Sequence, residues 1–110
     1  MPQILNAMIY RAGANADLVF ARSKPTWINL ACLAAGVEKT VTVPTGANFC
    51  IFSGDADFYV RPDATAALPA GDVTDGTGSE LNPAQWDVHD VQALHLIAAD
   101  DANVTMASYR

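Results

Sequence analysis

Between Val41 and Pro62, turn-forming residues separate three short runs of β-forming residues, and this pattern constrains the fold more than any other feature of the sequence. The three runs are Val41–Val43, Phe49–Phe52 and Phe58–Val60. Pro44-Thr45-Gly46 and Ser53-Gly54-Asp55 lie between them, and proline and glycine supply the backbone angles that tight turns need. Pro62 then ends the third run. The stretch predicts three consecutive antiparallel strands, a β-meander.

Further strands are predicted on both sides of this stretch. The candidates are Trp27–Leu33, Val37–Val43, Ala93–Ala98 and Asn103–Tyr109. In the first, Ile28, Leu30 and Cys32 share one face, and in the second the valines alternate with polar residues. About six to eight short strands, without a long amphipathic helix, predict an all-β fold. The expected fold class is a small antiparallel β-sandwich.

The 110 residues fit one domain, preceded by a segment of different character. Residues 1–26 are predicted to form an extended N-terminal arm, and residues 27–110 a single β-sandwich domain. A short helix over residues 4–10 is the alternative, because the apolar residues there fit both helical and strand spacing.

Residues 62–86 form the longest irregular section. Loops above about 12–15 residues are uncommon in compact domains unless they carry function or structure of their own. We expect Leu68, Val73, Leu81 and Trp86 to attach this section to the domain, and its remaining residues to make contacts specific to this protein.

The charge balance limits the partners. Twelve acidic residues against six basic ones give a net charge of −6, which disfavours binding to nucleic acid. No apolar run approaches the roughly 18 residues of a membrane span, and no signal peptide is evident. Charged residues make up 16% of the chain, against about 25% in an average domain. This low fraction predicts that some apolar surface lies against other subunits.

No motif predicts catalysis, a metal or a cofactor. Residues 72–80 are rich in oxygen ligands but lack EF-hand spacing, so turns explain them better than Ca²⁺ binding. Asp55 and Asp57 are expected to stabilise a turn. His89 and His95 are expected at the surface. The protein is therefore predicted not to be an enzyme.

Cys32 and Cys50 are too few for a disulfide framework. Both lie in apolar runs, which predicts two reduced, buried thiols in a protein made in a cytosol. A bridge between them is the alternative if their strands are neighbours.

A family resemblance rests on four segments. They are Thr42–Ala47, Phe52–Gly54, Ala56–Arg61 and Pro69–Pro83. In their order the chain resembles short structural proteins encoded by tailed bacteriophages and prophages, over about residues 37 to 109. The resemblance implies a capsid decoration, or cement, protein with a jelly-roll or related β-sandwich that forms trimers on the capsid lattice. It carries over no binding residue.

The expected function is therefore that of a virion structural protein. It would be made in the host cytoplasm and bind the capsid surface as a homotrimer, in contact with the major capsid protein, without nucleic-acid or membrane partners. The candidate interface residues are Ile4, Leu5, Met8, Ile9, Tyr10, Leu18, Phe20, Leu68 and Trp86. The alternative is a carbohydrate-binding or host-attachment module on the virion surface or tail, with Trp86 and Tyr59 in its binding platform.

Overall fold

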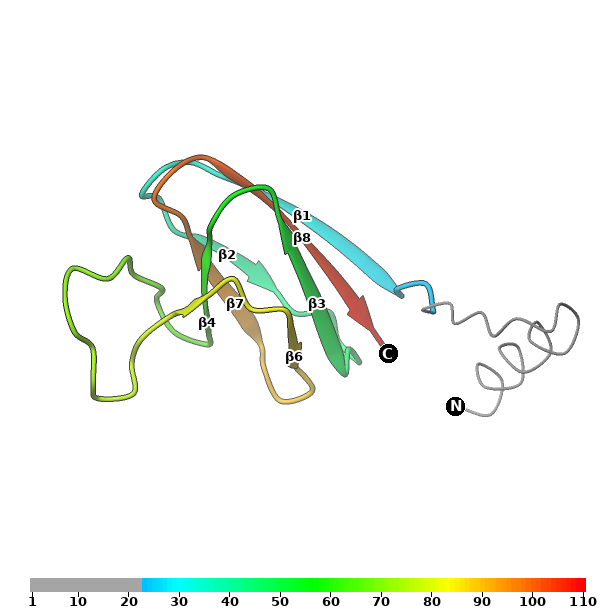
Figure 1. Cartoon of the computed structure of the whole chain (residues 1–110). Coiled ribbons are helices and arrows are strands. Elements are labelled where there is room, and N and C mark those ends of the chain that lie inside the picture. Colours follow the sequence, from blue (N-terminus) through cyan, green and yellow to red (C-terminus); the bar gives the residue numbers. More distant parts are fainter. Residues whose placement is uncertain (1–22) are drawn as a thin grey trace, which may run out of the picture.

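The computed structural model describes residues 23–110, which form eight β-strands and no helix. The strands are β1 (Trp27–Leu33), β2 (Lys39–Thr42), β3 (Phe49–Gly54), β4 (Tyr59–Pro62), β5 (Glu80–Leu81), β6 (Gln85–Asp87), β7 (Ala93–Ile97) and β8 (Ala102–Tyr109) (Figure 1). The interface residues predicted between Ile4 and Phe20, and the alternative helix over residues 4–10, lie outside the described residues.

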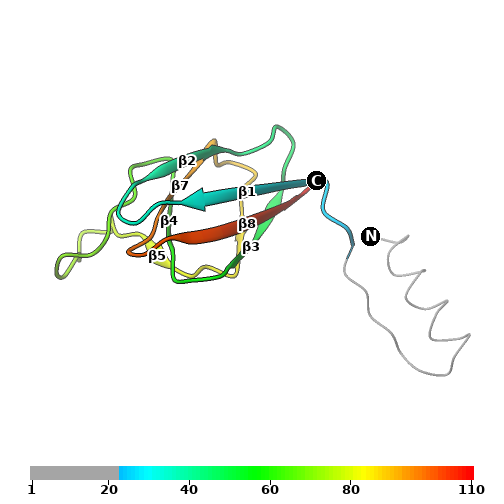
Figure 2. The ribbon, with the colours of Figure 1, turned by 90° about the horizontal axis from the view of Figure 1, so that it is seen from above.

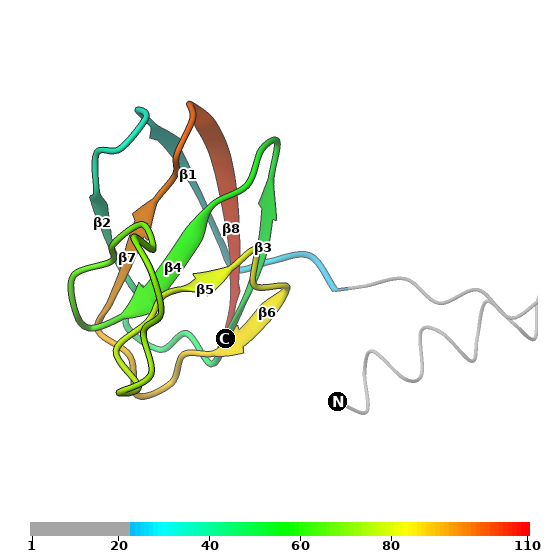
Figure 3. The same cartoon turned by 60° about the vertical axis from the view of Figure 1, so that its left-hand side comes forward.

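The strands pair in a nested order. β1 pairs with β8, β2 with β7, β3 with β6 and β4 with β5, all antiparallel. Pairings of β3 with β8 and of β4 with β7 complete two four-stranded sheets, ordered β1-β8-β3-β6 and β2-β7-β4-β5. The two sheets face each other (Figure 3). The predicted antiparallel β-sandwich is confirmed, and this strand order is that of a jelly roll.

The prediction of a β-meander over residues 41–62 is wrong in its pairing. The three strands form at the predicted places, but β2 and β4 lie in one sheet and β3 in the other. The turn residues therefore sit at corners where the chain crosses between sheets, and not in hairpins. The crossing arises because β2 and β4 pair with β7, whereas β3 pairs with β8.

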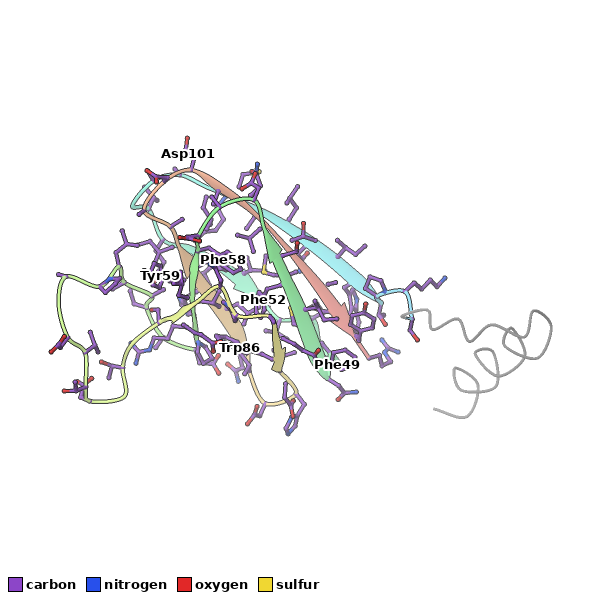
Figure 4. The ribbon with its side chains drawn as sticks, in the orientation of Figure 1. Phe49, Phe52, Phe58, Tyr59, Trp86 and Asp101 are labelled. Atoms are coloured by element: carbon purple, nitrogen blue, oxygen red, sulfur yellow. The ribbon has the colours of Figure 1, made fainter. Side chains whose placement is uncertain are left out.

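The core lies between the two sheets and is centred on β7 and β8. Leu96 and Val104 are completely buried, as is Val60 from β4. Three aromatic side chains pack together at one side of the core (Figure 4). The ring centroids of Phe52 and Trp86 are 5.3 Å apart in an edge-on arrangement, and those of Phe52 and Phe58 are 6.3 Å apart. Burial of each such side chain contributes about 1.5–3 kcal/mol to the free energy of unfolding, so the core between the sheets is the main source of stability.

The shared apolar face of β1 and the start of the second predicted strand are both exposed. Ile28, Leu30 and Cys32 share a face as expected, but that face points to solvent because Ala31 and Leu33 fill the core side of β1. Val37 is also exposed, since β2 begins only at Lys39.

The cysteines differ in environment. Cys50 is buried as predicted, but Cys32 is exposed on the outer side of β1. Both are free thiols, and β8 separates their strands.

The irregular section predicted over residues 62–86 is confirmed for residues 63–79, which contain no strand, and is wrong beyond them, because Glu80–Leu81 and Gln85–Asp87 form β5 and β6. The prediction that Val73 and Leu81 attach it to the domain is wrong, because both are about half exposed at 51% and 48%. Ala66 makes this attachment instead. It is buried, and its backbone N–H donates a hydrogen bond to Glu38 Oε2, beside β2.

Candidate protein-binding surface on the β1-β8-β3 sheet

An apolar surface covers the outer side of three adjacent strands. The strand register places Ile28 of β1, Ala107 of β8 and Ile51 of β3 side by side in one row. Leu30 begins the next row, and Phe49 lies at the end of β3. We call these five residues, with Thr105 and Ser53 between them, the outer apolar face.

Ile28 and Leu30 are the most exposed large apolar side chains of the outer apolar face. Ile28 is 65% exposed and Leu30 is 63% exposed, the highest fractions among the large apolar residues in the described part of the chain. Single exposed apolar residues are ordinary, but a contiguous group on a flat sheet is typical of an interaction site. Since covering each side chain would contribute roughly 1.5–3 kcal/mol, this face offers substantial binding energy.

The outer apolar face carries no charge. From β1 across β8 to β3, the other outward-facing residues are Cys32, Asn103, Thr105, Tyr109 and Ser53. Acidic residues lie at its margins. Asp87 of β6 is the cross-strand partner of Phe49, and Asp55 accepts hydrogen bonds from the Asn103 backbone N–H and Nδ2 at 2.8 and 2.9 Å. In a chain with a net charge of −6, an uncharged surface of this extent favours an apolar protein partner.

An aromatic stack borders the face. Phe49 and Tyr109 lie parallel, with ring centroids 4.7 Å apart and planes 8° apart. Beside them, the Arg110 guanidinium lies 5.2 Å from the centre of the Trp27 ring, a cation–π contact. These contacts pack the aromatic side chains together at this end of the sheet.

The outer side of the other sheet is polar by comparison. Thr40 Oγ1 and His95 Nδ1 lie 3.2 Å apart, and Glu38 Oε1 lies 3.7 Å from the same histidine nitrogen. Arg61 Nη1 donates to the Thr65 carbonyl in the long section. The register also places Ile97, Tyr59 and Leu81 side by side on this sheet, so its outer side carries both polar and apolar residues. The two outer faces differ because only this one has basic side chains, His95 and Arg61, within its central strands.

The two predicted interface residues in the domain lie away from this face. Leu68 is half-buried and lines a hollow of about 470 Å³ in the long section, together with Arg61 and Ser79. Trp86 packs on Phe52, and its Nε1 donates to Glu80 Oε1 at 3.0 Å. Core packing accounts for Trp86, and its predicted interface role remains a prediction.

Sequence reasoning missed Ile28 and Leu30 as surface residues, although a signal was present. A sandwich strand needs apolar residues on one face only, whereas Trp27–Leu33 is apolar on both. The second apolar face is the one that remains uncovered.

The acidic turns are structural, as predicted, but they act over longer distances than expected. Asp55 joins the β3–β4 turn to Asn103 at the start of β8, and these hydrogen bonds hold the pKa of its carboxyl below the ordinary value. Asp57 Oδ1 accepts a hydrogen bond from Asn82 Nδ2 at 2.8 Å. Similarly, Asp101 caps the β1–β2 turn by accepting from the Ala35 N–H (Figure 4).

The residues considered for metal binding show local contacts. Asp75 accepts hydrogen bonds from the N–H and hydroxyl of Thr77, which lower its pKa. Asp87 Oδ1 lies 2.6 Å from His89 Nδ1, and this contact raises the pKa of His89. Within residues 23–110, no three His, Cys, Asp or Glu side chains are grouped so that they could hold a metal ion.

Comparison with known proteins gives no relative for the chain. No protein-family model matches it, and neither a curated protein nor a solved structure is significantly similar. In the part of the chain that the structure describes, no helix is long and apolar enough to cross a membrane. The candidate site is thus identified from the structure alone. It is the outer apolar face, which is uncharged and suited to binding a protein.

Proposed function

We propose that the protein is a virion structural protein of a tailed phage or prophage, and that it decorates the capsid. In this role it binds the major capsid protein through the outer apolar face. The observation that carries the proposal is the exposure of Ile28 and Leu30 on a sheet face without charge. The resemblance of residues 37–109 to small phage structural proteins supports the same assignment.

Attachment by this face would be mechanical and would require no reaction. Covering apolar surface contributes about 25 cal/mol per Å², and a typical stable interface buries about 800 Å² on each partner. Copies that contact several lattice positions at once add avidity. In this way the protein would hold neighbouring capsid subunits together against outward pressure.

The charge distribution supports this orientation. With the uncharged face against the capsid, the acidic residues in the turns face solvent, as Asp55, Asp57 and Asp101 do. A negative outer surface keeps the decorated particle soluble and repels nucleic acid. Jelly rolls occur in viral capsid proteins but also in lectins, so the fold is compatible with the role without deciding it.

The host-attachment alternative would require an open aromatic platform for sugar. Trp86 lies against Phe52 and is hydrogen bonded to Glu80, and Tyr59 is half-buried. Because both aromatic side chains are partly covered, they do not form an open platform for a sugar. The proposal remains capsid decoration.

Binding to capsids that lack the protein tests the proposal. Ser53 is exposed on β3 beside Thr105, within the outer apolar face, and a lysine there would place a charge in the interface. We expect Ser53→Lys to weaken co-sedimentation with capsids at least tenfold. Thr40→Lys, on the outer side of the other sheet, is the matched control and should bind as the wild type does.

Equal binding by both variants would show that the outer apolar face does not attach the protein. Electron microscopy of decorated particles would then locate the protein directly. Density at the three-fold positions of the lattice is the result that the predicted trimer requires, and an absence of the protein from the head would reject capsid decoration.

A further inference from the structure

The two sheets have four edge strands, and one of them lacks the usual protection against pairing. Edges β2, β5 and β6 have only four, two and three residues. β1 has seven residues, Trp-Ile-Asn-Leu-Ala-Cys-Leu, with neither a charge nor a proline. Natural proteins keep edge strands short or charged because an exposed, apolar edge is a template for another strand. By its length and its lack of charge and proline, β1 is an edge strand on which another strand can pair.

The backbone of β1 can be oriented from hydrogen bonds elsewhere in the sheet. The Asp55 N–H donates to the Asn103 carbonyl at 3.1 Å, so Asn103 directs its backbone groups toward β3. Successive residues of a strand direct these groups to opposite sides, so Ala102 and Val104 direct theirs toward β1. Their partners there are Leu33 and Ala31.

The remaining residues of β1 therefore direct their backbone N–H and C=O groups away from β8. These residues are Ile28, Leu30 and Cys32, on the side where no strand within residues 23–110 pairs with β1 (Figure 2). The Cys32 carbonyl accepts a hydrogen bond from Lys39 Nζ at 3.1 Å, which agrees with this orientation and occupies that end of the edge. The open part of the edge is thus Ile28 to Leu30.

We infer that two copies of the chain pair through β1, antiparallel, about a two-fold axis at Asn29. In this register Ile28 of each copy lies opposite Leu30 of the other, and each residue both donates to and accepts from its opposite backbone. The Cys32 carbonyl keeps its contact with Lys39. The two four-stranded sheets β1-β8-β3-β6 become one continuous sheet.

The side chains favour a second copy as the occupant of this edge. Pairing in this register places Ile28 and Leu30 of both copies side by side, so the most exposed large apolar side chains of the described chain pack laterally on one another while their outer side stays open. Two copies that each carry a net charge of −6 repel one another, and β1 is an uncharged element where they can meet. The strand is self-complementary, as a two-fold contact requires.

This inference rests on the proposed structural role and deepens it, because pairing joins two outer apolar faces into one wider surface for the capsid. A two-fold dimer also differs from the trimer that the resemblance implies, and the mass of the complex distinguishes them.

Sedimentation velocity of the full chain at micromolar concentrations tests the pairing. We expect the wild type and Thr40→Lys to sediment as dimers, and Leu30→Lys to sediment as a monomer with unchanged circular dichroism. A monomeric or trimeric wild type, or a dimer that Leu30→Lys leaves intact, would overturn the inference.

Cross-linking tests the register without weakening the interface. The two Asn29 residues would face one another across the axis, within the distance that a disulfide spans. In a Cys32→Ser background, Asn29→Cys should give a disulfide-linked dimer under mild oxidation, whereas Ser53→Cys on β3 should not. Equal cross-linking of the two variants would contradict the register.

The capsid assay separates failure of the pairing from failure of the function. If the wild type is monomeric and Ser53→Lys still loses capsid binding, the β1 pairing is wrong and capsid decoration stands. If the dimer forms and no variant affects capsid binding, the pairing stands and the proposed docking face is wrong.

Discussion

A Cβ atom at Gly54 would lie 2.7 Å from the ring of Phe58. Gly54 ends β3, and Phe58 is buried at the point where the chain enters the other sheet. The corner between the sheets therefore depends on a glycine that leaves space for an aromatic side chain of the core. The carbonyl of Ala56 lies 3.2 Å from the same position and narrows it further.

Gly54→Ala should destabilise the protein by about 1–3 kcal/mol, because the methyl group must displace a packed ring. Gly71→Ala is the matched control, since no atom lies within 4 Å of its Cβ position. Urea unfolding followed by tryptophan fluorescence measures both. Equal stability of the two variants would show that the Phe58 ring moves aside without cost.

Leu96→Ala should lower the free energy of unfolding by about 2–5 kcal/mol, because Leu96 is completely buried at the centre of its sheet and would leave a cavity. Leu81→Ala removes the same atoms from a side chain that is 48% exposed, and should change stability by about 0.5 kcal/mol or less. Chemical denaturation of the two variants compares them directly. Similar losses would mean that the core is not centred on β7.

The two thiols should differ in reactivity. Cys32 is exposed, whereas burial raises the pKa of the Cys50 thiol and shields it from reagent. Labelling with a thiol reagent should modify one cysteine per native chain, and both in denaturant. Cys32→Ser should abolish the native reaction. Rapid labelling of that variant would show that Cys50 is accessible.

The pKa of His89 should lie above its ordinary value of 6.5, because Asp87 accepts a hydrogen bond from its ring and is negatively charged. Asp87→Asn should return this pKa toward 6.5, as measured by NMR titration of the ring protons. Asp72→Asn, at an exposed acid in the long section, is the control. An unchanged His89 titration in Asp87→Asn would rule out the pairing in solution.

The same pair sets a pH window for stability. The raised pKa of His89 means that its contribution is complete below pH 6.5 and is lost as the pH rises through the folded value. The lowered pKa of Asp87 means that its contribution is present above pH 3.8 and is lost as the pH falls through the folded value. The pair therefore stabilises the fold fully between pH 3.8 and 6.5. Asp87→Asn should reduce the fall of the melting temperature as the pH rises above 6.5 and as it drops below 3.8.

The strands could be predicted from the sequence because their signals are local. Proline or glycine ends the runs of β3 and β4, and the turn at Asp100-Asp101 separates those of β7 and β8, so all four strands are placed to within a residue or two. Pairing is a long-range property, and nothing near Val41 indicates that β2 pairs with β7 and not with β3. The meander prediction failed for this reason.

The candidate surface could be predicted only in part. The low fraction of charged residues indicated an apolar contact, but its place depends on which side of β1 faces the core. Trp27–Leu33 is apolar on both sides, so alternation alone could not decide. The burial of Ala66 depends on the path of a long irregular section and on its contact with Glu38, which no local pattern specifies.

The nested pairing also determines when the fold can form during synthesis. β7 and β8 are the last of the eight strands to leave the ribosome, yet each lies inside a sheet and holds two neighbours. Trp27 pairs with Ser108, so the sheet that contains β1 and β3 cannot form until β8 has emerged, and the other sheet cannot form before β7. Such distant partners make folding slow and leave apolar strands exposed meanwhile. The nascent chain would thus expose the apolar strand β1 until β8 has emerged.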